Sequence, residues 1–385
     1  MSALEVRKSV PRARLVLGGA LFALVVGLAG LTLSGSSGAT GRPADASSTG
    51  GVGILNGVSC ISTKSCIAVG YRGDKTVIES WDGAAWTIVP SPDHGFSSAL
   101  FGVSCSSVRW CVAVGDYADR SGQWALIESW NGGAWLVMRN PSLGSAGAEL
   151  LGVSCVSARA CKAVGGYGGG TLIESWNGAS WSVVPSSSTG SQRRQLDAVS
   201  CLSASSCVAV GNRASATLVE SWKGGSWSIV PSPTPGTYGG LSGVSCSSVK
   251  WCVAVGSYST GTGSGASAPG RTLVESWDGT AWSVASNLGP SVAYLFGASC
   301  VSAKRCQAVG EYRATSGLFR ALIESWDGTT WSVASNPSPL VAYLYGVSCS
   351  SARSCETVGQ FTNKVSGARP ADVLVESWNG TAWSI

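Results

Sequence analysis

The stretch from residue 153 to residue 181, VSCVSARACKAVGGYGGGTLIESWNGASW, contains the pattern that decides the fold. Two cysteines are separated by five residues, an ESW tripeptide follows, and a second tryptophan stands five positions after the first. The same succession occurs seven times, and the first cysteines are spaced by 45, 50, 46, 45, 54 and 49 residues. A period of this length is typical of a repeat architecture, so we expect one repeat domain over residues 52–385.

The cysteines all belong to these pairs, and none of the fourteen is left over. A zinc site needs four ligands, typically with C-x2-C spacing or histidines, and His94 is the only histidine. We therefore expect no metal or other cofactor, and seven disulfides formed in an oxidising compartment. The expected disulfides lie within single repeats: Cys60–Cys66, Cys105–Cys111, Cys155–Cys161, Cys201–Cys207, Cys246–Cys252, Cys300–Cys306 and Cys349–Cys355.

The N-terminus has the features of a targeting segment. Residues 1–14 form a basic flank, residues 15–33 are an uncharged apolar run, and residues 34–51 are a linker rich in Gly, Ser and Ala. Nineteen residues at ~1.5 Å each nearly span a ~30 Å hydrocarbon layer, which favours a membrane anchor helix. Small residues at Ser37/Ala39 or Ala44/Ala46 would equally suit cleavage of a signal peptide. In both cases the repeats are extracellular, either secreted or anchored to the outer side of the cytoplasmic membrane.

Composition limits the classes of partner. The chain is 44% hydrophobic and 12% charged, and it contains 52 glycines. Its net charge is +5, of which the first 14 residues supply +3, so the repeats are nearly neutral. Without a basic stripe or an arginine-rich tail, no nucleic-acid partner is expected. We expect contact with a membrane only through the N-terminal segment.

Each repeat predicts four short strands, with the sequences LxGVSC, CxAVG, TLIESW and WSVVP. Apolar runs bounded by glycine, with DG or NG between the last two, are hairpin signals, and no amphipathic helix pattern interrupts them. The expected fold is therefore all-β: a seven-bladed β-propeller of four-stranded antiparallel blades, preceded by an N-terminal hydrophobic helix. Because the repeats begin at a first strand and end at a fourth, we expect the ring to close by packing without a shared strand.

Several motifs resemble known propeller repeats. The succession AVGGY at 163–167, SWNG, and W followed by VPSP is similar to kelch and galactose-oxidase-type repeats, while SWDGTTW at 325–331 looks like a shortened Asp-box of sialidase-like propellers. The chain departs from kelch in its short turn and cysteine pairs, and from the Asp-box in having Asp and Gly adjacent. The resemblance implies repeats of a secreted bacterial propeller.

The glutamate of the ESW motif recurs in every repeat, so we interpret it as structural. If Asn177 and Gly178 form a two-residue turn, Glu174 faces Trp181 and shares a face with Trp176, whose indole N–H could satisfy the carboxylate. The equivalent acids are Glu79, Glu128, Glu220, Glu275, Glu324 and Glu376.

Two turns per repeat are expected at one, nearly uniform end of the propeller. The C-x5-C turn carries a base in six repeats, at Lys64, Arg109, Arg159, Lys250, Lys304 and Arg353, whereas repeat four has Ser205. The turn after ESW carries Asp or Asn except in repeat four, which has Lys223. This exchange suggests that the two turns lie close together.

The opposite end holds the variable loops, which is the usual arrangement of a recognition face. Aromatic residues that follow the AVG strand are expected to ring it: Tyr71, Tyr117, Tyr167, Tyr258, Tyr312 and Phe361. The alternative is that they merely cover the blade tops. The innermost strand adds an asymmetric set at the channel mouth: Asn56, Phe101, Leu151, Asp197, Ser242, Phe296 and Tyr345. We expect ligand contacts from the aromatic members and from Asp197, with the site over repeats five to seven, the loop Ser257–Arg271 beside it, and Arg193 and Arg194 near Asp197.

Two functions remain after these exclusions. The first is an exported, non-catalytic propeller that binds a glycan, cell-wall polymer or protein through the loop face. The alternative is a sialidase-like glycosidase or lyase, which needs two positioned carboxylates. The non-repeated acids available at the loop end are Asp93, Asp116, Asp119, Glu149, Asp197 and Glu311, and none lies in a recognisable catalytic motif. The sequence therefore favours binding and assigns no catalytic residue.

Overall fold

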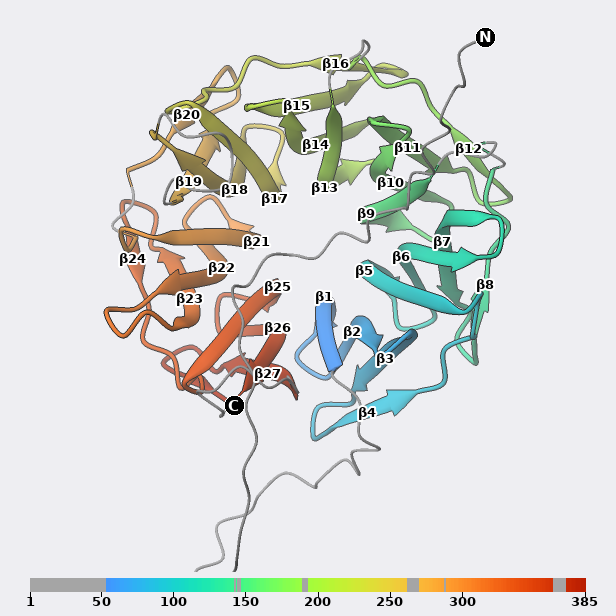
Figure 1. Ribbon diagram of the computed structural model, residues 1–385, viewed down its shortest axis with the longest axis horizontal. Helices are drawn as coiled ribbons and strands as arrows, with labels where there is room; N and C mark the ends of the chain where they lie inside the picture. Colours follow the sequence, from blue (N-terminus) through green and yellow to red (C-terminus); the bar gives the residue numbers. More distant parts are fainter. Residues whose placement is uncertain are drawn as a thin grey trace, which may run out of the picture.

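The computed structural model describes residues 53–141, 143, 147–188, 193–261, 270–286, 289–362 and 372–385. These residues form seven four-stranded antiparallel sheets arranged as a ring, which confirms the predicted seven-bladed β-propeller (Figure 1). The predicted basic flank, apolar helix and linker of residues 1–51 lie outside the described residues. Within the described part of the chain, no helix is long and apolar enough to cross a membrane.

Each blade uses four consecutive strands, from the innermost to the outermost (Figure 1). Blade 1 contains β1 (Gly53–Ser62), β2 (Ser65–Arg72), β3 (Lys75–Trp81) and β4 (Trp86–Val89), and blade 2 contains β5 (Ser97–Ser107), β6 (Trp110–Asp119), β7 (Gly122–Trp130) and β8 (Trp135–Val137). Blade 3 contains β9 (Ala148–Ser157), β10 (Ala160–Tyr167), β11 (Gly170–Trp176) and β12 (Trp181–Val183). Blade 4 contains β13 (Arg194–Ser203), β14 (Ser206–Arg213), β15 (Ala216–Lys223) and β16 (Ser226–Ile229).

The remaining three blades repeat this plan. Blade 5 contains β17 (Tyr238–Ser248), β18 (Trp251–Ser259), β19 (Arg271–Trp277) and β20 (Trp282–Val284), and blade 6 contains β21 (Ala293–Ser302), β22 (Arg305–Arg313), β23 (Phe319–Trp326) and β24 (Trp331–Val333). Blade 7 contains β25 (Val341–Ser351), β26 (Ser354–Thr362), β27 (Asp372–Trp378) and β28 (Trp383–Ser384). Within the described part of the chain, no strand is exchanged between the first and last blades, as predicted.

The hydrophobic core lies in the seams between neighbouring blades. In the seam between blades 1 and 2, Val69 and Ile78 of one blade pack against Leu100, Ala113 and Leu126 of the next, and all five are at most 1% exposed. Because both faces of every blade are covered in this way, the strands read as nearly continuous apolar runs in the sequence.

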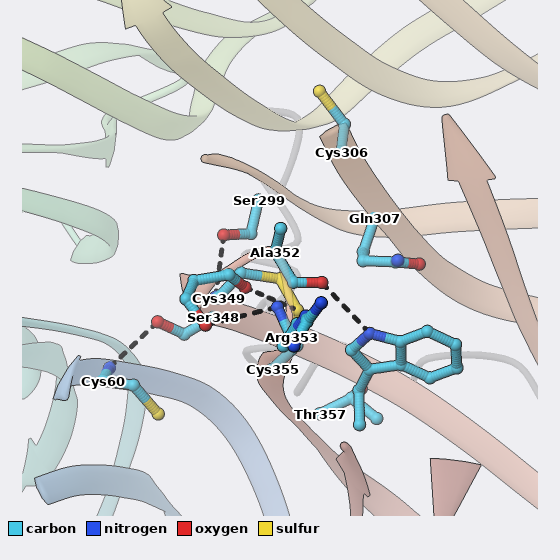
Figure 2. Close-up of a disulfide and its surroundings, with 12 residues drawn as sticks. Cys60, Ser299, Cys306, Gln307, Ser348, Cys349, Ala352, Arg353, Cys355 and Thr357 are labelled. Atoms are coloured by element: carbon cyan, nitrogen blue, oxygen red, sulfur yellow. Dashed lines mark hydrogen bonds between the residues drawn. A yellow bond between two sulfur atoms is a disulfide. The ribbon is translucent and has the colours of Figure 1, made fainter. Parts of the chain in front are cut away.

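A ring of hydrogen bonds links the seams to the disulfides. In each blade the serine before the first cysteine accepts, through Oγ, a hydrogen bond from the backbone N–H of the first cysteine of the next blade, at 2.9–3.0 Å. Figure 2 shows two successive links, from Cys349 to Ser299 and from Cys60 to Ser348. The second of these joins blade 7 to blade 1, so the ring closes with the same bond that holds its other seams.

The seven predicted disulfides are all present, each joining directly paired residues of the first two strands of a blade. The turn inside each disulfide is tied to the third strand, because the ESW indole N–H donates to the carbonyl of the middle residue of the C-x5-C turn. For example, Trp378 Nε1 donates to the Ala352 oxygen at 3.3 Å. The cystine, its turn and the end of the third strand therefore form one unit.

The turn between the third and fourth strands differs from the prediction. Trp176 pairs with Trp181, and Glu174 with Val183, so the connection has four residues in place of two. The Asn177 side-chain oxygen accepts hydrogen bonds from the N–H groups of Ala179 and Ser180, both at 2.9 Å, which closes the longer turn. Blade 4, whose connection is Gly224-Gly225 between paired Lys223 and Ser226, has the two-residue form.

Candidate ligand site at the inner rim of the loop end

A β-bulge occurs at the same place in all seven innermost strands. In blade 7, Leu344 pairs with Gly359 and Gly346 with Val358, which leaves Tyr345 as the extra residue. A bulge turns a side chain out of the regular alternation of a strand. The bulge residues are the asymmetric set predicted for the channel mouth, and we call them the inner rim: Asn56, Phe101, Leu151, Asp197, Ser242, Phe296 and Tyr345.

Glycine follows the bulge in six blades because neighbouring backbones meet there. A Cβ added at Gly297 would lie 2.8 Å from the Tyr345 carbonyl oxygen, and one added at Gly346 would lie 3.0 Å from that of Asn56. Real Cβ atoms are not found so close to backbone, so larger residues would push the blades apart. The tight packing brings successive rim residues together, as the Phe296 and Tyr345 ring centroids, 5.6 Å apart, demonstrate.

A second circle of side chains supports the rim from the second strands. Its members follow the glycine of the AVG motif: Tyr71, Asp116, Gly166, Asn212, Ser257, Glu311 and Gln360. Gln360 Nε2 donates to the Tyr345 hydroxyl at 2.7 Å, and Asn212 Nδ2 donates to Asp197 Oδ2 at 3.3 Å. Rim and second circle therefore form one surface, and sequence reasoning missed most of the second circle.

The predicted ring of six loop-face aromatics is divided between two positions. Tyr117, Tyr167, Tyr258, Tyr312 and Phe361 are half-buried and pack against the hydrophobic clusters of the seams. Tyr71 lies one position earlier along its strand than the other five aromatics do along theirs. It pairs with Ile54, whereas Tyr117 pairs with Ser98, which is equivalent in blade 2 to Gly53 of blade 1. Five of the six thus cover blade tops, and Tyr71 alone belongs to the second circle.

Two acids of this surface, Asp116 and Glu311, have raised pKa values. Burial raises the pKa of Glu311 to about 7, and no hydrogen bond to its carboxylate is present among the described residues. Burial and the charge of Glu149 raise the pKa of Asp116 to about 6, although a hydrogen bond from Gln123 opposes this shift. Burial, followed by the nearby Glu311 charge, raises the pKa of the Tyr345 hydroxyl. At pH 8 the surface therefore carries buried negative charge.

The other predicted polar residues are directed elsewhere. Asp93 forms an ion pair with Lys75 at 3.2 Å, and Asp119 accepts hydrogen bonds from the N–H groups of Ser121 and Gly122 in its own turn. Arg194 is buried near Glu220: burial raises the pKa of that carboxyl, and the Arg194 charge opposes the rise. Arg193 is exposed. Of the predicted loop Ser257–Arg271, residues 262–269 lie outside the described residues.

The repeated glutamates are buried, but their partners are not the predicted indoles. The ESW indole N–H groups donate to turn carbonyls, as Trp176 Nε1 does to the Ala158 oxygen at 3.0 Å. Four of them, Glu128, Glu220, Glu275 and Glu376, instead accept a hydrogen bond from a serine that follows the outer strand of the preceding blade. Ser186 Oγ donates to Glu220 at 2.6 Å, and Ser232 Oγ to Glu275 at 2.6 Å. These acids stabilise seams and lie away from the rim.

At the opposite end, the two turns of the blade touch in the six blades that carry a base, as the charge pattern predicts. A Cβ added at Gly178 would lie 3.0 Å from Arg159 Cγ, so the base packs its aliphatic stem on the turn glycine. In blade 4, where the base is missing, nothing lies within 4 Å of either turn glycine. The described residues contain no ion pair between these bases and the turn acids. We call this end the cystine face.

Among the described residues, no group of three or more His, Cys, Asp and Glu side chains could hold a metal ion.

Comparisons with known proteins identify the fold and no family. No family model matches the chain, and no curated protein matches it. Among solved structures, YCF48 bound to D1 peptide has a TM-score of 0.55 at 13% identity, covering 85% of this chain and 92% of that one. The structure of U3-55K has a TM-score of 0.56 at 13% identity, covering 84% and 94%. YCF48 from Cyanidioschyzon merolae has a TM-score of 0.54 at 13% identity, covering 86% and 96%.

Proposed function

We propose that this protein is an exported, non-catalytic β-propeller whose inner rim binds a protein segment that carries a basic side chain. The observation that carries the proposal is the combination of Phe296, Tyr345 and Glu311 on adjoining blades, where two contacting aromatic rings lie near a carboxylate. Neither the rim nor the second circle contains a lysine or arginine, whereas together they contain Asp116, Asp197 and Glu311.

A lysine or arginine side chain suits this surface for two reasons. Its cation is attracted to aromatic faces, worth ~0.5–2 kcal/mol depending on how far the pair is desolvated. It also supplies the donor and the positive charge that the buried Glu311 carboxylate lacks among the described residues. Peptide binding by a propeller has a precedent in YCF48 bound to D1 peptide, which is similar to this chain in fold.

A glycan or cell-wall polymer is the competing ligand. The apolar face of a sugar could stack on Phe296 and Tyr345, but a neutral sugar would not need the charge of Glu311. The ligand's dependence on that charge therefore separates the two classes.

A sialidase-like hydrolase is the second candidate, because Glu311 lies near the Tyr345 hydroxyl and a tyrosine–glutamate pair is what the resemblance would require. Three features argue against it. The pKa of Tyr345 is raised, its hydroxyl accepts a hydrogen bond from Gln360, and no arginine occupies the rim or second circle. We therefore assign binding without catalysis.

Export is supported by the seven disulfides, since disulfides persist in oxidising compartments. The basic flank and apolar run of residues 1–33 agree with this location. Protease treatment of intact cells would test it, because an anchored extracellular propeller is accessible to the enzyme and an internal one is protected.

The ligand class can be tested with the full chain, purified with its disulfides intact, on arrays of glycans, cell-wall fragments and random peptides. We expect peptides containing Lys or Arg to bind, and their Gln-substituted counterparts to bind at least tenfold more weakly. Glu311→Gln should weaken binding of the basic peptides by about tenfold or more, because a hydrogen bond to a charged group contributes ~1.5–3 kcal/mol.

Two further variants complete this test. Tyr345→Ala should abolish binding of the peptide, whereas Lys304→Ala, on the cystine face, should leave it unchanged. Binding of the wild-type chain should also weaken between pH 8 and pH 6, as Glu311 becomes protonated. Equal binding of basic and Gln-substituted peptides would refute the proposed ligand, and glycan binding that survives Glu311→Gln would assign the rim to carbohydrate.

A further inference from the structure

The seams at the cystine face are filled in different ways. At two seams the ESW tryptophan of one blade stacks on the tryptophan that precedes the second cysteine in the blade before it. Between blades 2 and 3, Trp110 stacks on Trp176, with centroids 6.2 Å apart and planes 24° apart. Between blades 5 and 6, Trp251 stacks on Trp326 in the same way, at 6.1 Å and 25°.

A third seam is filled by a cation. Between blades 3 and 4, the Lys162 ammonium lies 4.1 Å from the centroid of the Trp222 ring and donates to Ser175 Oγ at 2.9 Å. The molecule thus uses its own side chains to cover the ESW indoles.

In two other seams serine stands before the second cysteine, and a cavity lies beside the ESW indole of the next blade. Ser206, between blades 4 and 5, borders a cavity of about 270 Å³ that is also lined by Val208, Val249, Trp277 and Trp282. Ser65, between blades 1 and 2, borders a smaller cavity of about 120 Å³ against Trp130. Trp277 is half-buried here, as Trp326 is under its stacking partner, while Trp176 is 8% exposed.

We propose that the cavity between blades 4 and 5 is a binding site for an aromatic side chain, an indole or phenol, of a protein partner. The ring would stack on Trp277 as Trp251 stacks on Trp326 one seam later. This site goes beyond the proposed rim function, because it lies at the opposite end of the propeller and uses none of the rim residues.

The surroundings of the cavity specify this occupant. The buried indole nitrogens of Trp110 and Trp251 have no hydrogen-bond partner in the described residues, so the same place in other seams accepts a ring without satisfying a polar group. Val249 is 65% exposed and Leu202 37% exposed at the edge, which gives the entrance an apolar border. Stacked aromatic pairs gain ~0.5–1.5 kcal/mol beyond the apolar area that they bury.

Lys223 adds a charge preference. It lines the cavity, and its ammonium lies 5.9 Å from the centroid of the Trp277 ring. An acidic residue beside the aromatic one in the partner would therefore bind more tightly than a basic one.

The site can be tested by titrating the full chain with N-acetyl-L-tryptophanamide and following the indole N–H resonances by NMR. We expect the Trp277 resonance, identified with Trp277→Phe, to shift with a Kd on the order of 1 mM, and N-acetyl-L-leucinamide to bind at least fivefold more weakly. The peptide Ac-Asp-Trp-Asp-NH2 should bind more tightly than Ac-Lys-Trp-Lys-NH2, and Lys223→Ala should remove that preference.

The repeats supply matched variants for this test. Ser206→Trp fills the seam as Trp251 fills its own and should abolish the response of Trp277, while Trp251→Ser should create a new response at Trp326. Ser206→Arg, which copies Arg305 of blade 6, serves if Ser206→Trp does not fold. An unchanged response in the filled variant, or equal binding of the leucine probe, would overturn the proposal; Glu311→Gln should have no effect on it.

Discussion

The repeated glutamates combine almost complete burial with few hydrogen bonds. Glu128, Glu174 and Glu275 are 0% exposed, and burial raises their pKa values to about 7, about 8 and about 7. Serine hydroxyls donate to Glu128 and Glu275, whereas both carboxyl oxygens of Glu174 lack a partner among the described residues. The neutral acid is therefore the form that fits these seams.

This burial predicts that the protein loses stability as the pH rises. The carboxyls have a usual pKa of 4.5 in the unfolded chain and about 7 to 8 in the folded one, so the folded state holds more protons between these values. The free energy of unfolding then decreases from pH 5 to pH 8. Each group contributes a decrease of ~1.4 kcal/mol per pH unit between its unfolded and its folded pKa. Thermal unfolding at a series of pH values measures this slope.

Glu174→Gln isolates one contribution to the slope. The amide keeps the shape of the neutral acid, so we expect a higher Tm than wild type at pH 8 and little difference at pH 5. Asp278→Asn is the control, because the pKa of Asp278 is lowered to about 2 by hydrogen bonds from Thr280 and Ala281, outside this pH window. A Glu174→Gln variant with the wild-type slope would show that this carboxyl does not titrate with folding.

At the scale of the elements, strand order followed from the sequence but two backbone details did not. Asn-Gly predicts a two-residue hairpin turn, yet the Asn177 side chain accepts two backbone N–H groups and closes a four-residue turn with Trp176 opposite Trp181. The observed register places the two indoles opposite each other, 5.7 Å apart, whereas the predicted one would place Trp176 opposite Ala179. The bulge of the innermost strand was also not predicted from the sequence, because its only local signal is the glycine that follows it.

The contact between the two turns of a blade has a measurable effect. Gly178 (φ +95°) and Gly225 (φ +100°) both have left-handed backbone, but only Gly178 packs against a base, Arg159. Gly178→Ala and Gly225→Ala should share a backbone penalty of about 1 kcal/mol, and Gly178→Ala should lower Tm further because its Cβ meets Arg159 Cγ. Adding Arg159→Ala should narrow the gap between the two variants without closing it, because it removes Cγ but keeps the Arg159 Cβ 3.1 Å from the added methyl; a gap that does not change would exclude the Cγ contact.

At the scale of the whole molecule, the ring and its disulfides could be predicted because they repeat. The candidate site could not be predicted in the same way, since it depends on differences between repeats. Phe101, Phe296, Tyr345 and Asp197 could be found as variable residues of the innermost strands. Glu311 could not be given a role, since its proximity to Tyr345 arises only when blades 6 and 7 are placed side by side.

Closure of the ring leads to a prediction about its weakest seam. The chain connects blade 2 to blade 3 covalently, whereas the described residues of blades 7 and 1 are joined by packing and by links such as that from Cys60 N–H to Ser348 Oγ. Ser348→Ala leaves that N–H without its acceptor, at a cost of ~1–3 kcal/mol. Hydrogen exchange should therefore accelerate in β1 and β25 in this variant.

Ser104→Ala removes the equivalent acceptor between blades 2 and 3. Exchange in β5 and β9 should accelerate less there, because the covalent connection keeps these blades together when the bond is lost. Equal acceleration in the two variants would show that all seams have the same local stability.

The uniform link between blades also has an evolutionary consequence. Each blade is encoded by one uninterrupted stretch of sequence, and each presents the same serine acceptor to its successor and the same cysteine N–H to its predecessor. A gene duplication or recombination with its ends in the linkers would therefore deliver a complete blade with compatible edges. In a propeller that shares a strand between its termini, the same event at the ends would split a blade. Whole repeats of this protein are thus suitable units of genetic exchange, while the rim, built from one residue per repeat, can diversify separately.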